Sequence, residues 1–292
     1  MKPFRILGDT TAHTRNWEQL PARGLVVESV GELWFPKSTE APYIIRNDAV
    51  TNDGIMSLKS HPGPAVITGG FANDMFVVAL LRSIASAVLI GANTLAEETE
   101  HLWVADEMLK LAGLDSSPFP RVFAEMRTEL HLPTHPTLIV LTRSGKLPAE
   151  ARVYSAHEVP MVVCTTVEGR TQIPHAVASR PNITILTYDG VHLAELIPEF
   201  ARLGLGRIIV EAGPTVASEF MKEQLIHEEW TTTFPRILGT GEGRSGRVTH
   251  PFAPGSEPMS KMLTLRSATW ETERHGETLT LPVLFQRSQI VY

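Results

Sequence analysis

Short apolar runs alternate with helix-like segments along most of the chain. The runs are typical of strands buried on both faces of a sheet, and they lie at residues 43–50, 87–91, 137–142, 160–166, 183–187 and 207–210. Between them, apolar residues three or four apart predict helices at 75–85, 104–112, 123–130, 191–203 and 215–225. Alternating residues at 228–235 and a hairpin of 262–273 with 277–287 across His275-Gly276 add strands at the end. This order predicts a three-layer α/β/α domain with a mixed central sheet.

The segment from Arg207 to Ala217 predicts a buried strand, a tight turn and the start of a helix. Gly213 is expected to let the backbone turn without a Cβ, and Pro214 is favoured at the first helical position. The free N–H groups of that first turn can receive a phosphate. Glu211 places a carboxylate at the carboxyl end of the strand, where open α/β sheets bind ligands. A plain strand–helix junction, in which Glu211 only caps backbone N–H groups, is the alternative.

Two other segments contain candidate functional residues. Asp53-Gly54 predicts a turn, 57–73 a loop, and Asn73 or Asp74 a cap for the next helix. Arg82 lies among apolar neighbours on that helix, either as a surface arginine or as an anchor for an anion or carbonyl group.

Two further strand ends could bind phosphate or ribose. Gly91 to Glu98 repeats the strand–glycine–helix pattern, with Asn93 or Thr94 as a cap and an acidic first turn. Thr142-Arg143-Ser144 places an arginine between hydroxyls, which suits a phosphate monoester. An exposed turn with an incidental arginine is the alternative there.

Composition narrows the class of protein. The chain has 292 residues, of which 43% are hydrophobic, and a net charge of −6, so nothing in its charge indicates nucleic-acid binding. Cys164 is the single cysteine, which excludes internal disulfides and cysteine-rich zinc sites. We expect no metal site, no membrane span and a cytoplasmic location. Residues 1–41 are expected to form an N-terminal extension that wraps the main domain or a partner subunit, and 42–292 the main domain, with an insertion or lid at about 100–135.

Four motifs in the same order resemble the pyrimidine reductases of riboflavin biosynthesis, which have a dihydrofolate-reductase-like fold. They are the segments 47–54, 88–95, 210–215 and 234–239. The resemblance implies an NADPH-dependent reductase of the 5-amino-6-(5-phosphoribosylamino)uracil type, which converts a ribosylamino group into a ribitylamino group. It also implies a homodimer, with the C-terminal strands as a candidate interface.

Carried over residue by residue, the resemblance implies Asn47, Asp53 and Glu211 as catalytic residues and Arg82 with Glu211 as substrate-binding residues. The cofactor-binding residues that it implies are Val50, Gly91, Thr94, Glu98, Thr142, Arg143, Gly213, Pro214, Thr215, Val216 and Ala217.

The sequence also departs from the family pattern. The usual Asp-Asp-Pro after the second junction reads Glu97-Glu98-Thr99, and the apolar residues 102–105 replace a basic segment that helps to hold the substrate phosphate. A reductase of the same fold with another small heterocycle or carbonyl substrate therefore remains open, as does a non-catalytic NADP-binding module.

Overall fold

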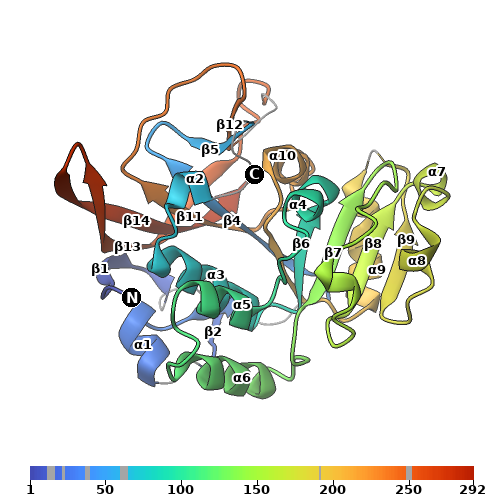
Figure 1. The fold of residues 1–292 in the computed structure, drawn as a ribbon, viewed down its shortest axis with the longest axis horizontal. Coiled ribbons are helices and arrows are strands. Elements are labelled where there is room, and N and C mark those ends of the chain that lie inside the picture. Colours follow the sequence, from blue (N-terminus) through green and yellow to red (C-terminus); the bar gives the residue numbers. More distant parts are fainter. Residues whose placement is uncertain (12–16, 22–23, 37–39, 60–64, 191, 248–251) are drawn as a thin grey trace.

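A computed structural model describes residues 1–11, 17–21, 24–36, 40–59, 65–190, 192–247 and 252–292. Its main feature is a ten-stranded sheet in the order β1-β13-β14-β11-β4-β10-β6-β7-β8-β9 (Figure 1). In that order the strands are Arg5–Asp9, Met259–Arg274, Glu277–Val291, Glu228–Phe234, Tyr43–Thr51, Arg207–Val210, Ala87–Gly91, Thr137–Thr142, Met161–Thr165 and Ile183–Thr187. The strands from β11 to β9 run parallel to one another, whereas the pairs β1–β13, β13–β14 and β14–β11 are antiparallel.

Helices cover both faces of the sheet. The described helices are α1 (Gly24–Val30), α2 (Ala65–Thr68), α3 (Ala72–Ile84), α4 (Ala92–Glu97), α5 (Ala105–Leu111), α6 (Phe119–Glu129), α7 (Val167–Arg170), α8 (His175–Ala178), α9 (Leu196–Arg202) and α10 (Pro214–Lys222). Along β10, Ile209 packs with α1, α3, α5 and α6, whereas Ile208 and Val210 pack with α9 and α10. The predicted three-layer α/β fold with a mixed sheet is therefore confirmed.

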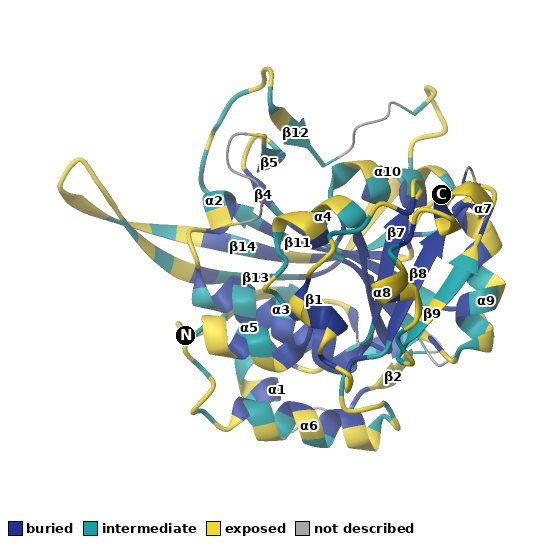
Figure 2. Ribbon diagram, turned by 45° about the vertical axis from the view of Figure 1, so that its right-hand side comes forward, coloured by how far each residue is buried: buried dark blue, intermediate teal, exposed yellow. Residues whose placement is uncertain are grey.

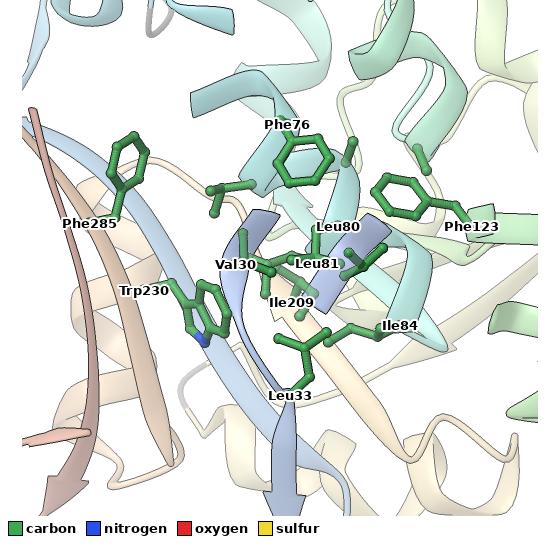
Figure 3. Packing of buried hydrophobic residues seen from close by; sticks show 14 of the residues in the cluster. Val30, Leu33, Phe76, Leu80, Leu81, Ile84, Phe123, Ile209, Trp230 and Phe285 are labelled. Carbon is green, nitrogen blue, oxygen red and sulfur yellow. The ribbon is translucent and has the colours of Figure 1, made fainter. Parts of the chain in front are cut away.

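The largest part of the core lies between α3 and the sheet. Phe76, Leu80 and Leu81 of α3 share one buried cluster with residues of the sheet, and Figure 3 shows Leu80 and Leu81 beside Ile209 of β10. The central strands are buried along most of their length, as Figure 2 shows in dark blue. This packing fixes α3 against the carboxyl end of β10, where the candidate residues gather.

Part of the predicted N-terminal extension belongs to this core. Val26 and Val30 of α1 are buried in it, as is Phe35 of β3 (Trp34–Pro36), which pairs with β2 (Trp17–Gln19). β1 forms the edge of the main sheet beside β13. The residues of 1–41 that the structure describes thus pack onto the domain, and the predicted boundary at residue 42 remains a prediction.

The segment at 100–135 also packs into the core. Leu109 of α5 is buried beside α3, as are Phe119, Phe123 and Met126 of α6. The second predicted helix of this segment begins earlier than expected, at Phe119, because Pro120 is tolerated in the first turn. In the structure these helices pack against α3 as part of this layer.

Several local predictions were wrong. The expected loop at 57–73 contains α2 and overlaps β5 (Ile55–Leu58), which pairs with β12 (Arg244–Gly246); residues 60–64 lie outside the described residues. Helix α3 is capped at Phe71 without a side-chain bond, so neither Asn73 nor Asp74 caps it. The Asn73 side chain instead bonds the backbone of Lys2, at 2.8 and 3.0 Å.

The helix after β6 differs from the prediction in the same way. Gly91 is its N-cap residue, and Asn93 and Thr94 lie inside the first turn without capping it. That turn holds no acidic residue, because Glu97 and Glu98 fall at the other end of this short helix. The predicted helix at 191–203 is shorter, with a 3₁₀ turn at Leu193–Glu195 followed by α9; Val191 lies outside the described residues.

Candidate functional site

An ion pair between Arg82 and Glu211 forms the centre of the candidate site. Nε of Arg82 donates to one carboxylate oxygen of Glu211 at 3.0 Å, and an NH₂ nitrogen donates to the other at 2.7 Å. The two side chains are 3% and 10% exposed. This bidentate geometry fixes both groups and brings together two residues that the sequence predicted for the substrate site.

Backbone geometry explains where Glu211 lies. It follows Val210, the last residue of β10, and its N–H donates to the carbonyl of Leu89 in β6 at 2.9 Å. Side chains alternate between the faces of a strand, so Glu211 shares the face of Ile209, which is covered by α3. Arg82 reaches it from the last turn of that helix.

Arg82 is also held by the chain after α4. Its third nitrogen lies 3.0 Å from Nε2 of His101 and donates to the carbonyls of Leu102 and Val104 at 3.4 and 3.3 Å. Burial, with the charge of Arg82, lowers the pKa of His101 to about 3, so His101 is neutral. All three guanidinium nitrogens are thus engaged by the protein itself.

Two further acidic residues lie near this pair. Burial raises the pKa of Glu98, with the Arg82 charge acting against it and the Glu211 charge adding to it. Burial also raises the pKa of Asp74 to about 6, although a hydrogen bond with Thr232 opposes the shift. The charge of Glu211 contributes to this rise. Glu98 and Asp74 are thus two buried acidic residues on which the charge of Glu211 acts.

Strand β4 supplies the neighbouring surface. Asn47 and Ala49 stay half-exposed on a strand that is otherwise mostly buried, and they stand on the face that α3 covers. Across the ladder, Asn47 pairs with Trp230 and Ala49 with Thr232, the hydrogen-bond partner of Asp74. Asn47 is therefore on the same face as Glu211. Val50 is buried on the opposite face.

The turn at Gly213 differs from the prediction in its backbone and agrees with it in the start of the helix. Gly213 has φ −57°, which every residue can adopt, so the expectation that the turn needs glycine for its backbone was wrong. A Cβ at this position would meet no atom within 4 Å. Helix α10 begins at Pro214, as predicted. The space beside its first turn is therefore open to a group that approaches the backbone closely.

Other predicted cofactor residues surround this turn. A Cβ on Gly91 would lie 3.5 Å from the side chain of Val216, so the two strand–helix junctions face each other. Thr94 is half-buried, Thr215 is exposed and Ala217 is buried.

Thr142 and Arg143 lie two strands away, at the carboxyl end of β7. Thr142 is buried and Arg143 is exposed. The carbonyl of Arg143 accepts a hydrogen bond from Thr166 at 3.1 Å. Burial raises the pKa of Tyr188, and the positive charge of the Arg143 guanidinium opposes this rise. The Arg143 side chain also lies within 3.8 Å of the position of a Cβ on Gly190. Arg143 is thus an exposed cation at the same sheet edge.

Asp53 has contacts of another kind. Its carboxylate accepts N–H groups from Leu238 at 3.1 Å and Gly239 at 2.5 Å, and the hydroxyl of Thr51 at 2.5 Å. These bonds lower the pKa of Asp53 and fasten the 51–54 turn to the segment after β11. They do not link Asp53 to the Arg82–Glu211 pair, and its catalytic role stays a prediction.

Sequence reasoning missed His101, Thr232 and the functional interest of Asp74. Asp74 had a signal, since it is an acidic residue in an apolar helix, but it was interpreted as a cap. His101 had none, because its role depends on its contact with Arg82. Among the described residues, no three His, Cys, Asp or Glu side chains are placed to hold a metal ion. None of the described helices combines the length and apolar character of a membrane span.

The family follows from a match over most of the chain. Residues 42–272 match the family model described as the RibD C-terminal domain. The chain belongs to the RibD C-terminal domain family. This family was the one that the four sequence motifs predicted.

Curated relatives of this family are distant. RibD, a riboflavin biosynthesis protein of Aquifex aeolicus, is 24% identical over 204 residues, which are 69% of this chain and 49% of that protein. The chain thus spans about half the length of that relative. A 2,5-diamino-6-ribosylamino-4(3H)-pyrimidinone 5′-phosphate reductase of Archaeoglobus fulgidus is 21% identical over 246 residues, which are 84% of this chain and 99% of that protein.

Solved structures of the RibD family share the fold. A pyrimidine reductase-like protein of Corynebacterium diphtheriae has a TM-score of 0.62 at 16% identity, over 86% of this chain and 92% of that one. RibD of Acinetobacter baumannii has a TM-score of 0.57 at 18% identity, over 87% and 59%.

Replacing Asp74 by Asn should stabilise the protein at neutral pH. Burial penalises the carboxylate more than the acid, so the wild type loses stability as pH rises from about 4 to about 6. The rise of the Asp74 pKa from 3.8 to about 6 corresponds to a loss of at most about 3 kcal/mol in the free energy of unfolding. In urea unfolding, the free energy of unfolding of Asp74→Asn should be higher than that of the wild type by up to this amount at about pH 7.5. The two values should be equal at about pH 4.

The exposed Asp115 provides a matched control, because Asp115→Asn makes the same chemical change where no burial penalty exists. This control should leave stability unchanged at both pH values. A wild type that is more stable than Asp74→Asn at the higher pH would contradict the assigned cost of the buried carboxylate.

Proposed function

We propose that this member of the RibD C-terminal domain family is an NADPH-dependent reductase of the 5-amino-6-(5-phosphoribosylamino)uracil type in riboflavin biosynthesis. The observation that carries the proposal is the fixed Glu211 carboxylate beside the open turn at Gly213, at one edge of the sheet. The reductase name of the Archaeoglobus relative, which this chain covers almost completely, supports the same activity.

The residues around Gly213 fit a dinucleotide. The first N–H groups of α10 are suited to a pyrophosphate, and the missing Cβ leaves room for it. The facing junction at Gly91, with Thr94 and Glu98, would complete the cofactor site together with Val50 and residues 214–217. Thr142 and Arg143 would lie near the adenosine 2′-phosphate, since an exposed guanidinium can bind two phosphate oxygens at once.

When bound, NADPH supplies a hydride for the ribosylamino carbon of the substrate. The protein supplies position and electrostatics. Glu211 cannot rotate freely while Arg82 holds both of its oxygens, so its outer lone pairs can accept an N–H of the ring or hold a proton in a fixed place. Asn47, half-exposed on the same face, is placed to orient the substrate with it.

A second candidate is a reductase of the same fold with a different small heterocycle or carbonyl substrate. Leu102, Trp103 and Val104 are buried where the sequence resemblance leads us to expect a basic segment for the substrate phosphate. Arg82 cannot take over that task readily, because its nitrogens are already engaged. This observation favours a substrate whose phosphate is bound elsewhere or is absent.

We further propose a cytoplasmic homodimer. The hairpin of β13 and β14 extends well beyond the body of the domain in Figure 2. At its other end, Met259 and Met262 are exposed apolar residues at the sheet edge. Paired C-terminal strands would cover such residues.

The purified protein should bind NADPH more tightly than NADH. Binding would be measured by titration, with the quenching of tryptophan fluorescence as the signal. The protein should then oxidise NADPH when 5-amino-6-(5-phosphoribosylamino)uracil is added. Binding without turnover on this substrate would favour the second candidate or a non-catalytic NADP-binding module. Absence of binding for both nucleotides would refute the reductase assignment.

Substitution of Gly213 by Ala should weaken NADPH binding about tenfold or more, because a methyl group would occupy the space beside the first turn of α10. The fold should be unaffected, since that methyl group meets no atom of the protein. Gly206→Ala is the matched control, because Gly206 also has no neighbour within 4 Å of a Cβ but lies at the other end of β10. Equal affinities of both variants would remove Gly213 from the cofactor site.

Glu211→Gln should leave NADPH affinity unchanged and lower kcat at least about tenfold, because the fixed carboxylate charge is lost. It should also cost about 3 kcal/mol of stability, since buried Arg82 loses its bidentate ion pair. Glu125→Gln breaks an exposed pair with Arg121 and should change neither quantity measurably. Wild-type turnover by folded Glu211→Gln would exclude Glu211 from the reaction.

A further inference from the structure

The last turn of α3, which carries Arg82, ends without a glycine. Its C-cap residue, Ala85, has an extended backbone with φ −86° and ψ 143°, so the chain leaves the helix directly. The carbonyl groups at the end of an α-helix have no partners within the helix and need donors from elsewhere. For α3 these donors come from two arginines on other elements, Arg127 of α6 and Arg207 at the start of β10.

Arg127 binds most of these carbonyl groups. Its Nη1 donates to the carbonyls of Arg82, Ser83 and Ala85 at 3.0, 3.3 and 2.8 Å, and its Nε donates to the carbonyl of Pro133 at 2.6 Å. The residue is 4% exposed. Among the described residues its hydrogen-bond partners are all backbone oxygens. This buried cation is therefore matched to the negative end of the helix dipole.

Arg207 binds the next carbonyl of the same turn. Its Nη1 donates to the carbonyl of Ile84 at 2.9 Å, and its backbone N–H donates to the hydroxyl of Ser86 at 2.9 Å. The end of α3 is thus fastened to the amino end of β10, whereas Glu211 follows the carboxyl end of that strand. Two arginines from opposite sides together fix the position of this turn.

The segment 100–135 contacts Arg82 at both ends of the residue. The chain after α4 binds the guanidinium through His101 and two backbone carbonyls, and Arg127 binds the backbone carbonyl. Helical side chains point towards the amino end of their helix, so Arg82 reaches back from the last turn to Glu211. A tilt of this turn would move the start of the side chain, and the guanidinium would no longer fit both carboxylate oxygens.

We propose that Arg127 is a positioning residue of the reductase. By holding the last turn of α3, it keeps Arg82 in the orientation in which the guanidinium binds both oxygens of Glu211. The segment 100–135 is then part of the framework of the site. It cannot open as a lid without breaking its contacts with Arg82. This inference rests on the proposed function for the role of Glu211 in the reaction.

An NMR measurement tests the positioning directly. The Nε–H of Arg82, which donates to Glu211 at 3.0 Å, should give a side-chain signal that exchanges slowly with water, and Arg82→Lys would assign it. Arg127→Met removes the guanidinium and keeps an apolar stem. In this variant the Arg82 signal should move towards those of exposed arginines and exchange at least about tenfold faster. Arg127→Lys, which keeps a cation but fewer donors, should shift it in the same direction and serves if Arg127→Met does not fold.

Arg287 is the internal reference, because its Nε–H donates to Glu228 at 2.6 Å in another buried ion pair. Its signal should stay unchanged in the Arg127 variants. Arg266→Met is the matched control, since Arg266 is also 4% exposed but lies on β13 beside the edge strand β1. It should leave the Arg82 signal unchanged. An unchanged Arg82 signal in a folded Arg127 variant would overturn the proposal, as would equal changes in the signals of both reference and target.

Kinetics then test whether the positioning serves the reaction. Arg127→Met should lower kcat at least about tenfold and leave NADPH affinity unchanged, because the displaced group is the Glu211 pair and not the turn at Gly213. In a Glu211→Gln background the same change should have little further effect on kcat. Independent, multiplicative effects would refute a role through Glu211. A changed Arg82 signal in a protein without reductase activity would uphold the hold of Arg127 on Arg82 while the proposed function fails.

Discussion

The bidentate pair of Arg82 and Glu211 determines how the two halves of the site meet. It joins the last turn of α3 to the carboxyl end of β10, and it draws in the chain after α4 through His101 and two backbone carbonyls. A pair buried this deeply contributes little net stability, because desolvation of both charges offsets most of their attraction. It contributes geometry instead: three segments far apart in the sequence are held at one edge of the sheet, and Glu211 has one orientation.

The buried acidic residues of the chain have two kinds of surroundings. Asp48 and Glu229 share Arg46 and Arg247, a compensated network that holds the chain after β12 against the sheet. Burial raises the pKa of Asp74 and of Glu98, the charge of Glu211 adds to both rises, and the charge of Arg82 opposes the rise for Glu98.

Much of the fold could be predicted from the sequence, because strands buried on both faces leave continuous apolar runs such as 87–91 and 137–142. Glu211 was found because a carboxylate at the end of such a run is unusual. Short elements were missed: β5 and α2 follow a turn in a segment rich in Gly, Pro and Ser, where local propensity favours a loop. The roles of His101 and Asp74 depend on contacts across 19 and 158 residues, with Arg82 and Thr232, and local spacing carries no such information.

The order of strands in the sheet has a consequence for synthesis of the chain. Strands β6 to β9 are neighbours in both sequence and space, so they can associate early. The other half joins strands from opposite ends of the chain, since β1 pairs with β13 and β4 with β11. Contacts of such long range form slowly. Until the last quarter of the protein is synthesised, β4 lacks its partner β11, and an unpaired strand edge of this kind favours aggregation.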